Sequence, residues 1–415
     1  MSNESTPDIG LLTKMAEEGR PAAQYRLGLS LFAGVQTPAD RAKAIEWWEK
    51  AAAGGSHEAE FMLGQCFQFG TGVPQNLSRA AFWYEKAAQG GHPQARLNVA
   101  SMLISGTGAG KDEAGAFEWL KAAADDGFDK AAAALGRLYQ EGVGTATDLN
   151  QAFRYFSSAG EKGNCEAQYS LALMYLGGQA VPRDEMLAVE WLTKAAQQGF
   201  KLAEFELAKC YLQARGIAQD YGRSLDWFAR AAAKGHAPAE YYLGLMHANG
   251  LGVPRSPQKF RHHMTKAAEA GLIEAQYLLG CMLYQGSYLN RDLREAVIWL
   301  EKAAKRGSPQ AQFLAGLIYL NDLPDYEAAF HWNREAARQN CVEAQYNLGY
   351  QFACGLGVQK DPVQALEWYR SCSALAKNDS SRAVLAEKSA LAIEQLQREM
   401  GSAGPTATKP LPQEA

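Results

Sequence analysis

One short pattern returns along this chain at a nearly constant spacing, and it constrains the fold more than any other feature. The segments AQYRLG and AEFMLG end at Gly28 and Gly64, which are 36 residues apart. Further steps of 36 residues reach a Gly or an Ala each time, and a final, shorter step of 33 residues reaches Gly349. The ten positions are Gly28, Gly64, Ala100, Gly136, Ala172, Ala208, Gly244, Gly280, Gly316 and Gly349. A period of this size is typical of stacked structural repeats, so we expect ten units.

Two further columns define two helices per unit. An Ala stands five residues before every small residue, as in AEYYLGLMH, which has the spacing of one helix face, called here the A helix. A second helix, the B helix, carries a mostly aromatic column 19 residues after the small residue, or 16 in the ninth unit. This column is Trp47, Trp83, Trp119, Tyr155, Trp191, Trp227, His263, Trp299, Trp332 and Trp368. Because Gly and Ala let two helix axes approach closely, we expect the Trp to fill the wider gap beside them.

Linkers and ends complete the predicted domain organisation. The linkers within units are rich in Gly, as in FGTGVPQN, and have Asp or Pro near the next helix start. The shorter ninth unit places a deletion near NDLPDYEAAF. We expect a disordered segment over 1–10, a solenoid over 11–376 that begins with a lone B-type helix, a capping helix over 380–400 and a disordered tail over 401–415.

These units resemble Sel-one-like repeats, which are relatives of the tetratricopeptide repeats. The segments AQYLLG, GLGVQKDP and AVIWLEKAAKRG follow the family patterns AQYxLG, GxGVxxD and KAxxWYxKAAxxG. The resemblance covers roughly residues 11–376 and implies an all-α, right-handed superhelical solenoid of about ten helix-turn-helix repeats of 36 residues, with capping helices at both ends. It also implies that A helices line the concave face and that the protein binds other proteins as a scaffold, adaptor or regulator. The family has no shared catalytic residues to transfer.

Charge and cysteine content limit the classes of partner that we expect and indicate the cellular compartment. With 41 basic and 45 acidic residues, the net charge is −4, which gives no electrostatic reason to expect nucleic acid or an anionic membrane as a partner. No apolar run approaches the roughly 18 residues of a membrane span, and MSNESTPDIG has no features of a secretory signal. The seven cysteines include no C-x-x-C pair, so we read them as free thiols and expect a cytoplasmic protein.

The predicted binding surface is the face of the A helices opposite their buried face. With the small residue as position zero, this face holds positions −3, +1, +4 and +5, and Arg137, Glu141 and Lys209 are its only charges. Such an apolar and aromatic lining suits a segment of a partner protein, although the same side chains could instead pack neighbouring A helices. The predicted partner-binding residues are Phe205, Lys209, Tyr241, Leu245, Tyr277, Tyr284, Gln285, Phe313, Leu317, Tyr346 and Tyr350.

No segment predicts catalysis, a cofactor or a metal. SGTGAGKDE lacks the first Gly and the final Ser or Thr of a phosphate-binding loop, so we read it as a linker. Secreted, cysteine-rich members of the resembled family include some reported to act on β-lactams, but this chain lacks their regular cysteine pairs. We therefore expect a non-enzymatic scaffold. The alternatives are an inhibitor or immunity-type protein that neutralises a toxin enzyme, and a hydrolase such as a β-lactam-directed one.

The seventh unit departs from the repeat at three positions. His263 takes the Trp position, Phe260 takes a position that is otherwise Ala or Ser, and His247 takes a position that is often Tyr. A large residue has replaced a small one at one place while smaller residues have replaced larger ones at others, which is typical of compensated repacking. We expect His247 and His263 to face each other inside the unit, with a hydrogen bond between or near them, and His262 to point away.

Overall fold

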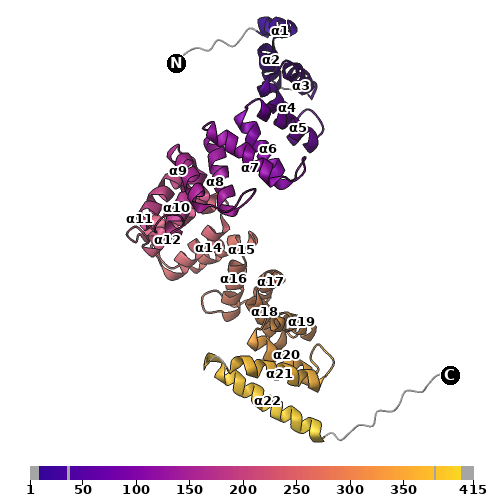
Figure 1. Ribbon diagram of the computed structural model, residues 1–415. Coiled ribbons are helices and arrows are strands. Elements are labelled where there is room, and N and C mark those ends of the chain that lie inside the picture. The colour runs from indigo at the N-terminus through magenta and orange to yellow at the C-terminus, as the bar shows by residue number, and fades with distance from the viewer. Residues whose placement is uncertain (1–8, 35–37, 378–379, 403–415) are drawn as a thin grey trace, which may run out of the picture. The chain divides into compact units, whose positions relative to one another are not determined.

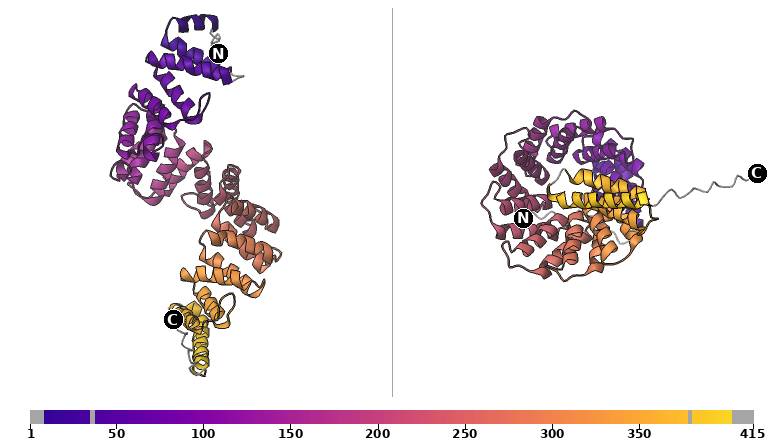
Figure 2. Two further views of the ribbon diagram at one scale, coloured as in Figure 1. Left: turned by 90° about the vertical axis from the view of Figure 1, so that its right-hand side faces the viewer. Right: turned by 90° about the horizontal axis from the view of Figure 1, so that it is seen from below.

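The chain is an all-α solenoid, as the sequence predicts. The computed structural model describes residues 9–34, 38–377 and 380–402, and these contain helices and no strand. A and B helices alternate along the chain, and on either side of residues 219–220 each helix packs against the next (Figure 1). The chain divides into an N-terminal unit, residues 1–219, and a C-terminal unit, residues 220–415, which are described separately. Within each unit, helix pairs stack in chain order (Figure 2).

The N-terminal unit begins with a single B-type helix, followed by alternating A and B helices. Its helices are α1 (Ile9–Glu17), α2 (Pro21–Ala33), α3 (Pro38–Ala53), α4 (His57–Phe69), α5 (Leu77–Gln89), α6 (Pro93–Ser105), α7 (Glu113–Asp125), α8 (Asp129–Glu141), α9 (Leu149–Glu161), α10 (Cys165–Gly177), α11 (Glu185–Gln197) and α12 (Lys201–Gln213).

The C-terminal unit continues the alternation and closes with a longer helix. Its helices are α13 (Tyr221–Ala233), α14 (Ala237–Asn249), α15 (Pro257–Glu269), α16 (Ile273–Gln285), α17 (Leu293–Lys305), α18 (Pro309–Asn321), α19 (Tyr326–Arg338), α20 (Val342–Cys354), α21 (Pro362–Ala376) and α22 (Ala383–Ser402), with a 3₁₀ turn at Ser380–Arg382.

Polar residues of the linkers explain where the B helices begin. From α5 to α21, the side chain at each B-helix N-cap accepts a hydrogen bond from a backbone N–H in the first turn, which satisfies a donor that has no intrahelical partner. These caps are Asn76, Asp112, Asp148, Asp184, Asp220, Ser256, Asp292, Asp325 and Asp361. The predicted deletion is confirmed, because residues 322–325 join α18 to α19, whereas residues 286–292 join α16 to α17.

The expected role of the Trp column is wrong, because the residue after it faces the small residue of the A helix. This next residue is 0–3% exposed in every unit: Trp48, Tyr84, Leu120, Phe156, Leu192, Phe228, Met264, Leu300, Asn333 and Tyr369. A methyl group added to Gly64 would stand 2.5 Å from Tyr84 Cδ1, and one on Gly280 would stand 2.6 Å from Leu300 Cγ. Adjacent residues on a helix differ by about 100° in direction, so only one of the two columns can face the small residue.

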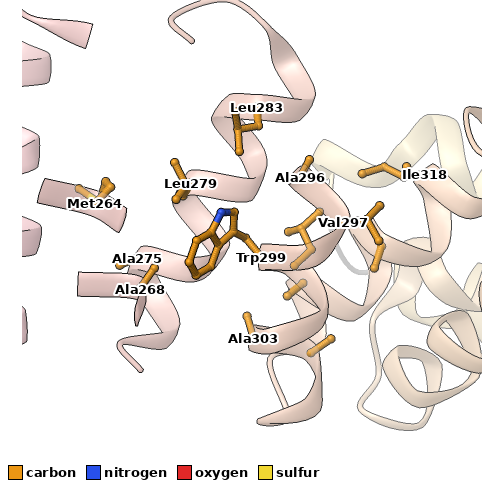
Figure 3. Packing of buried hydrophobic residues seen from close by; sticks show 14 of the residues in the cluster. Met264, Ala268, Ala275, Leu279, Leu283, Ala296, Val297, Trp299, Ala303 and Ile318 are labelled. Atoms are coloured by element: carbon orange, nitrogen blue, oxygen red, sulfur yellow. The ribbon is translucent and has the colours of Figure 1, made fainter. Parts of the chain in front are cut away.

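The Trp column instead joins consecutive repeats. Trp119 packs against a core cluster that contains Tyr84 and against the next cluster, which contains Leu120. In the C-terminal unit, Trp299 shares one cluster with Ala268 of α15 and Leu279 of α16 (Figure 3). Most of these rings are half-buried, and a Lys or Arg three residues later covers several of them, as Lys302 does at 3.9 Å from the Trp299 ring.

A glutamine column that sequence reasoning missed holds successive helices together. Gln168 is 4% exposed, and its Nε2 donates to the carbonyl oxygen of Gly160, in the last turn of the preceding B helix, at 3.0 Å. The carbonyls of a last helical turn have no intrahelical donor, so this bond uses acceptors that would otherwise need water. Gln24, Gln276, Gln312 and Gln345 make the same bond to a residue eight positions earlier. The recurring Gln of AQYxLG was the available signal.

The first and last helices extend slightly beyond the boundaries that the sequence predicts. Ile9 and Gly10 form the first turn of α1, and the helical backbone of α22 extends to Ser402, so the predicted disordered segments 1–10 and 401–415 are wrong at these residues. The ends of a helix often differ by one or two residues from the ends that a sequence pattern predicts, because the terminal turns fray. Residues 1–8 and 403–415 lie outside the described part. Helix α22 occupies the stretch predicted to cap the solenoid, and its Leu396 is buried against α21.

Candidate functional site

The predicted partner-binding residues lie on A helices and are divided between the two units. Phe205 and Lys209 belong to α12 of the N-terminal unit, and the other nine belong to α14, α16, α18 and α20 of the C-terminal unit. None of the eleven is fully buried. Gln285 and Tyr350 are exposed, and the remaining nine are half-buried.

The aromatic residues at position −3 also pack against core. Tyr241 and Tyr277 pack against the cluster that contains Leu279, and Phe313 packs against the cluster of the following repeat. The Tyr346 ring lies 5.4 Å from the Tyr369 ring, measured between centroids. These side chains therefore have a structural role, and their outer parts contribute to the A-helix face.

The hydroxyl groups of Tyr241, Tyr277 and Tyr346 on this face remain protonated at neutral pH. Burial raises the pKa of Tyr241 and of Tyr346. Burial, together with a hydrogen bond with Cys281, raises the pKa of Tyr277 to about 12. Each phenol can therefore donate a hydrogen bond to a partner while its ring supplies apolar contact.

A hollow of about 450 Å³ adjoins Tyr277 in the C-terminal unit. It is lined by Ile273, Glu274, Tyr277, Arg306, Gly307, Ser308 and Gln310, from α16, the turn between α17 and α18, and the first turn of α18. The Arg306 guanidinium is engaged with the carbonyl oxygen of Gly271. The hollow thus places one predicted residue beside polar side chains that sequence reasoning did not single out.

Lys209, the one predicted basic residue, is neutralised within its own helix. Its Nζ lies 3.0 Å from a Glu206 carboxylate oxygen and 5.3 Å from the centre of the Phe205 ring. The pair is three residues apart on α12, so the face around Phe205 presents no uncompensated positive charge.

A second hollow, of about 490 Å³, opens between α6 and α8 of the N-terminal unit. Leu97, Ala100, Ile104, Leu120, Ala134, Leu138 and Val143 give it apolar walls, and Asn98, Ser101, Ser105, Arg137 and Glu141 add polar groups. None of these residues is among the eleven named partner-binding residues, although Arg137 and Glu141 lie on the predicted A-helix face. The available signal was the absence of an aromatic residue at position −3 of the third repeat, where Leu97 stands.

The expectation that His247 and His263 face each other inside the seventh repeat is confirmed, whereas His262 does not point fully away, because its ring centroid lies 5.2 Å from that of His263. The rings of His247 and His263 are parallel within 5° with centroids 5.6 Å apart, and His263 Nδ1 lies 2.7 Å from Glu240 Oε2. His247 is 5% exposed, and His262 is exposed. Glu240 takes the position at which five other repeats have the bonding Gln, so the substitution at the Trp position has a polar partner across the helix pair.

Other residues that could bind a metal or a phosphate, or act as nucleophiles, have structural explanations. The described residues hold no cluster of three or more His, Cys, Asp or Glu that could bind a metal ion. All seven cysteines are free, and burial raises the pKa of the Cys66 and Cys210 thiols to about 11. Asp112 of the segment that resembles a phosphate loop caps α7 by accepting from the Gly115 N–H. Within the described ranges, no helix has both the length and the apolar character needed to cross a membrane.

Comparison with known proteins covers almost the whole solenoid. The family model of the Sel1 repeat matches ten consecutive segments: 21–56, 57–92, 93–128, 129–164, 165–200, 201–236, 237–272, 273–308, 309–341 and 342–374. A protective antigen of uropathogenic Escherichia coli strains that displays an SLR fold is 28% identical, with a TM-score of 0.69 over 99% of this chain and 100% of that chain. A Sel1 repeat protein from Oxalobacter formigenes is 30% identical, with a TM-score of 0.59 over 76% of this chain and 92% of that chain.

Two further comparisons add nothing about function. An immunity protein from Pseudomonas aeruginosa is 18% identical, with a TM-score of 0.37 over 52% of this chain and 82% of that chain, and this likeness is too low to carry an argument. No curated protein matches the chain.

Proposed function

The chain belongs to the Sel1 repeat family, and from that premise we propose that it is a non-enzymatic scaffold whose A-helix faces bind a segment of a partner protein. Proteins with these repeats generally mediate protein–protein interaction. The observation that carries the proposal is the A-helix face of the C-terminal unit, where half-buried Tyr241, Tyr277 and Tyr346 accompany the exposed side chains of Gln285 and Tyr350. Rigid aromatic side chains with a polar tip are the residues that most often anchor an interface.

The same proposal covers the class of partner and the compartment. A net charge of −4 favours a protein over a nucleic acid, and free thiols are typical of a reducing compartment such as the cytoplasm. An inhibitor or immunity-type role is a narrower form of this function, in which the bound partner is an enzyme that loses activity.

The test is affinity capture of partners from the producing cells, followed by mass spectrometry. The variant Gln285→Glu/Tyr350→Glu puts carboxylates on the proposed surface, where their desolvation would weaken an apolar contact by a few kcal/mol. The matched control is Ile298→Glu, because Ile298 is 55% exposed on a B helix at a position where four other repeats carry Glu. We expect the double variant to lose a partner that the wild type and the control retain.

Capture of the same partners by all three proteins, with the fold unchanged by circular dichroism, would refute the surface assignment. Adding the chain to the captured partner and measuring the partner's activity separates an inhibitor from an adaptor. Turnover of ester, phosphate or lactam substrates by the purified chain would refute the non-enzymatic assignment and favour a hydrolase.

A further inference from the structure

One column of the repeat lacks its aromatic residue in two neighbouring repeats of the N-terminal unit. Position −3 of the A helix carries Tyr or Phe in eight of the ten repeats, and the two exceptions are Leu97 of α6 and Ala133 of α8. Elsewhere this ring packs toward the following repeat, as Tyr25 and Phe61 do. Two consecutive exceptions therefore remove the rings that would otherwise occupy the space between adjacent A helices.

The hollow between α6 and α8 lies where the first of these rings is missing, because Leu97 lines it, whereas Ala133 packs in the core cluster of the following repeat. Its volume of about 490 Å³ is within the range of about 300–1,000 Å³ that is typical of ligand pockets. Ala100, Leu120 and Leu138 are 1–4% exposed and form the bottom, whereas Ser101 and Ser105 at its edge are exposed. A side chain carried on another polypeptide can thus reach apolar walls from the A-helix face.

The edge of the hollow carries two uncompensated charges. Arg137 and Glu141 are both exposed and stand one turn apart on α8, about 6 Å along the axis. Within residues 9–34, 38–377 and 380–402, neither side chain makes an ion pair or hydrogen bond, and they do not pair with each other. Two other polar side chains of the lining have internal bonds, since Asn98 Oδ1 accepts from Gln94 Nε2 and Ser105 Oγ donates to the Ser101 carbonyl oxygen.

We propose that the hollow between α6 and α8 is a socket for an aromatic side chain of a partner-protein segment, with a carboxylate of the same segment bound by Arg137. The aromatic occupant replaces the ring that is missing at Leu97, in surroundings that accept Tyr or Phe in the other repeats. A guanidinium binds a carboxylate through charge-assisted hydrogen bonds, and Glu141 repels an acidic group at the other end, so the two charges orient the segment. This inference rests on the proposed function and adds the position and the chemistry of one contact.

The probes are blocked tetrapeptides that hold one Phe flanked by Glu, by Gln or by Lys, titrated into the full-length chain by isothermal calorimetry at low ionic strength. We expect the Glu-flanked peptide to bind about tenfold more tightly than the Gln-flanked one, as is typical of a hydrogen bond between charged groups, and the Lys-flanked one to bind most weakly. Arg137→Gln should remove this preference, and Arg137→Lys should keep part of it. The control Arg154→Gln changes an exposed Arg of α9 and should change nothing.

A second pair of variants fills the hollow from within. Leu97→Tyr restores the residue that position −3 carries in other repeats, and Ala134→Leu enlarges a side chain in the lining. Either variant that keeps the wild-type circular dichroism spectrum should lose peptide binding. Unchanged binding by a folded filling variant, equal affinity for the Glu- and Gln-flanked peptides, or no binding to the wild type at millimolar concentration would overturn the inference.

Failure here is distinguishable from failure of the proposed function. If the peptides do not bind while partner capture still depends on Gln285 and Tyr350, only the socket is wrong. If capture is insensitive to the A-helix faces, the proposed function is wrong whatever the peptides do.

Discussion

Replacing Gly136 with Ala tests the claim that the residue after the Trp column, and not the Trp, sets the distance between paired helices. A Cβ on Gly136 would stand 2.8 Å from Cδ1 and Cε1 of Phe156, a contact that requires the ring or the backbone to move. Overpacking of this kind costs about 1–3 kcal/mol. Ala in place of Gly inside a helix returns about 1 kcal/mol. We therefore expect a net change between about zero and 2 kcal/mol of destabilisation.

The second perturbation removes the ring. Phe156→Leu alone should cost on the order of 1–2 kcal/mol for the lost apolar contact. In that background, Gly136→Ala should stabilise by about 1 kcal/mol, because the methyl group no longer meets the ring. The coupling free energy of the cycle is then about 1–3 kcal/mol. The preceding repeat already contains this combination, as Ala100 with Leu120 in one core cluster.

The assay is equilibrium urea unfolding followed by far-ultraviolet circular dichroism for the wild type, both single variants and the double variant. Midpoints are compared at a shared m-value. Gly244→Ala is the matched control, since its nearest neighbour is the flexible end of Met264, at 2.7 Å from the added Cβ, so it should be neutral or stabilising. Stabilisation of the wild type by Gly136→Ala, or a coupling below about 0.5 kcal/mol, would refute the reasoning.

Three further predictions concern buried polar groups. Burial, Lys259 and His263 lower the pKa of His247 below 6.5, so the unfolded chain binds a proton at this residue more readily than the folded chain does. The free energy of unfolding should therefore fall as pH drops through 6.5. The urea midpoint of His247→Leu should fall less over the same pH range than the midpoint of the wild type. Gln168→Ala leaves the carbonyl oxygen of Gly160 without its donor and should lower the free energy of unfolding in urea by about 1–3 kcal/mol. An unchanged free energy of unfolding would contradict the assigned hydrogen bond. Because burial raises its thiol pKa to about 11, Cys66 should react with iodoacetamide at pH 8 far more slowly than the exposed Cys354, as followed by peptide mass spectrometry, and equal rates would disprove its burial.

Local pattern was sufficient for the elements of this fold. The column of Gly and Ala, the linker Asp and the glycines after the B helices predict ten helix pairs, and Asp112 and Asp148 cap helices where the linker pattern places them. These features act within a few residues of each other, through backbone hydrogen bonding and helix periodicity, so the chain order alone reveals them. The face of each A helix also follows from its spacing, because 100° per residue is a property of the helix itself.

Tertiary structure decided which of two neighbouring columns meets the small residue and where space is left over. Trp47 and Trp48 are adjacent in sequence, and only the packed helix pair shows that Trp48 is fully buried beside Gly28. The missing ring at Leu97 is visible in the sequence, but the hollow beside it depends on how far the surrounding side chains relax to fill the space. Packing of this kind is a sum over neighbours from several helices, and no periodicity within one helix encodes it.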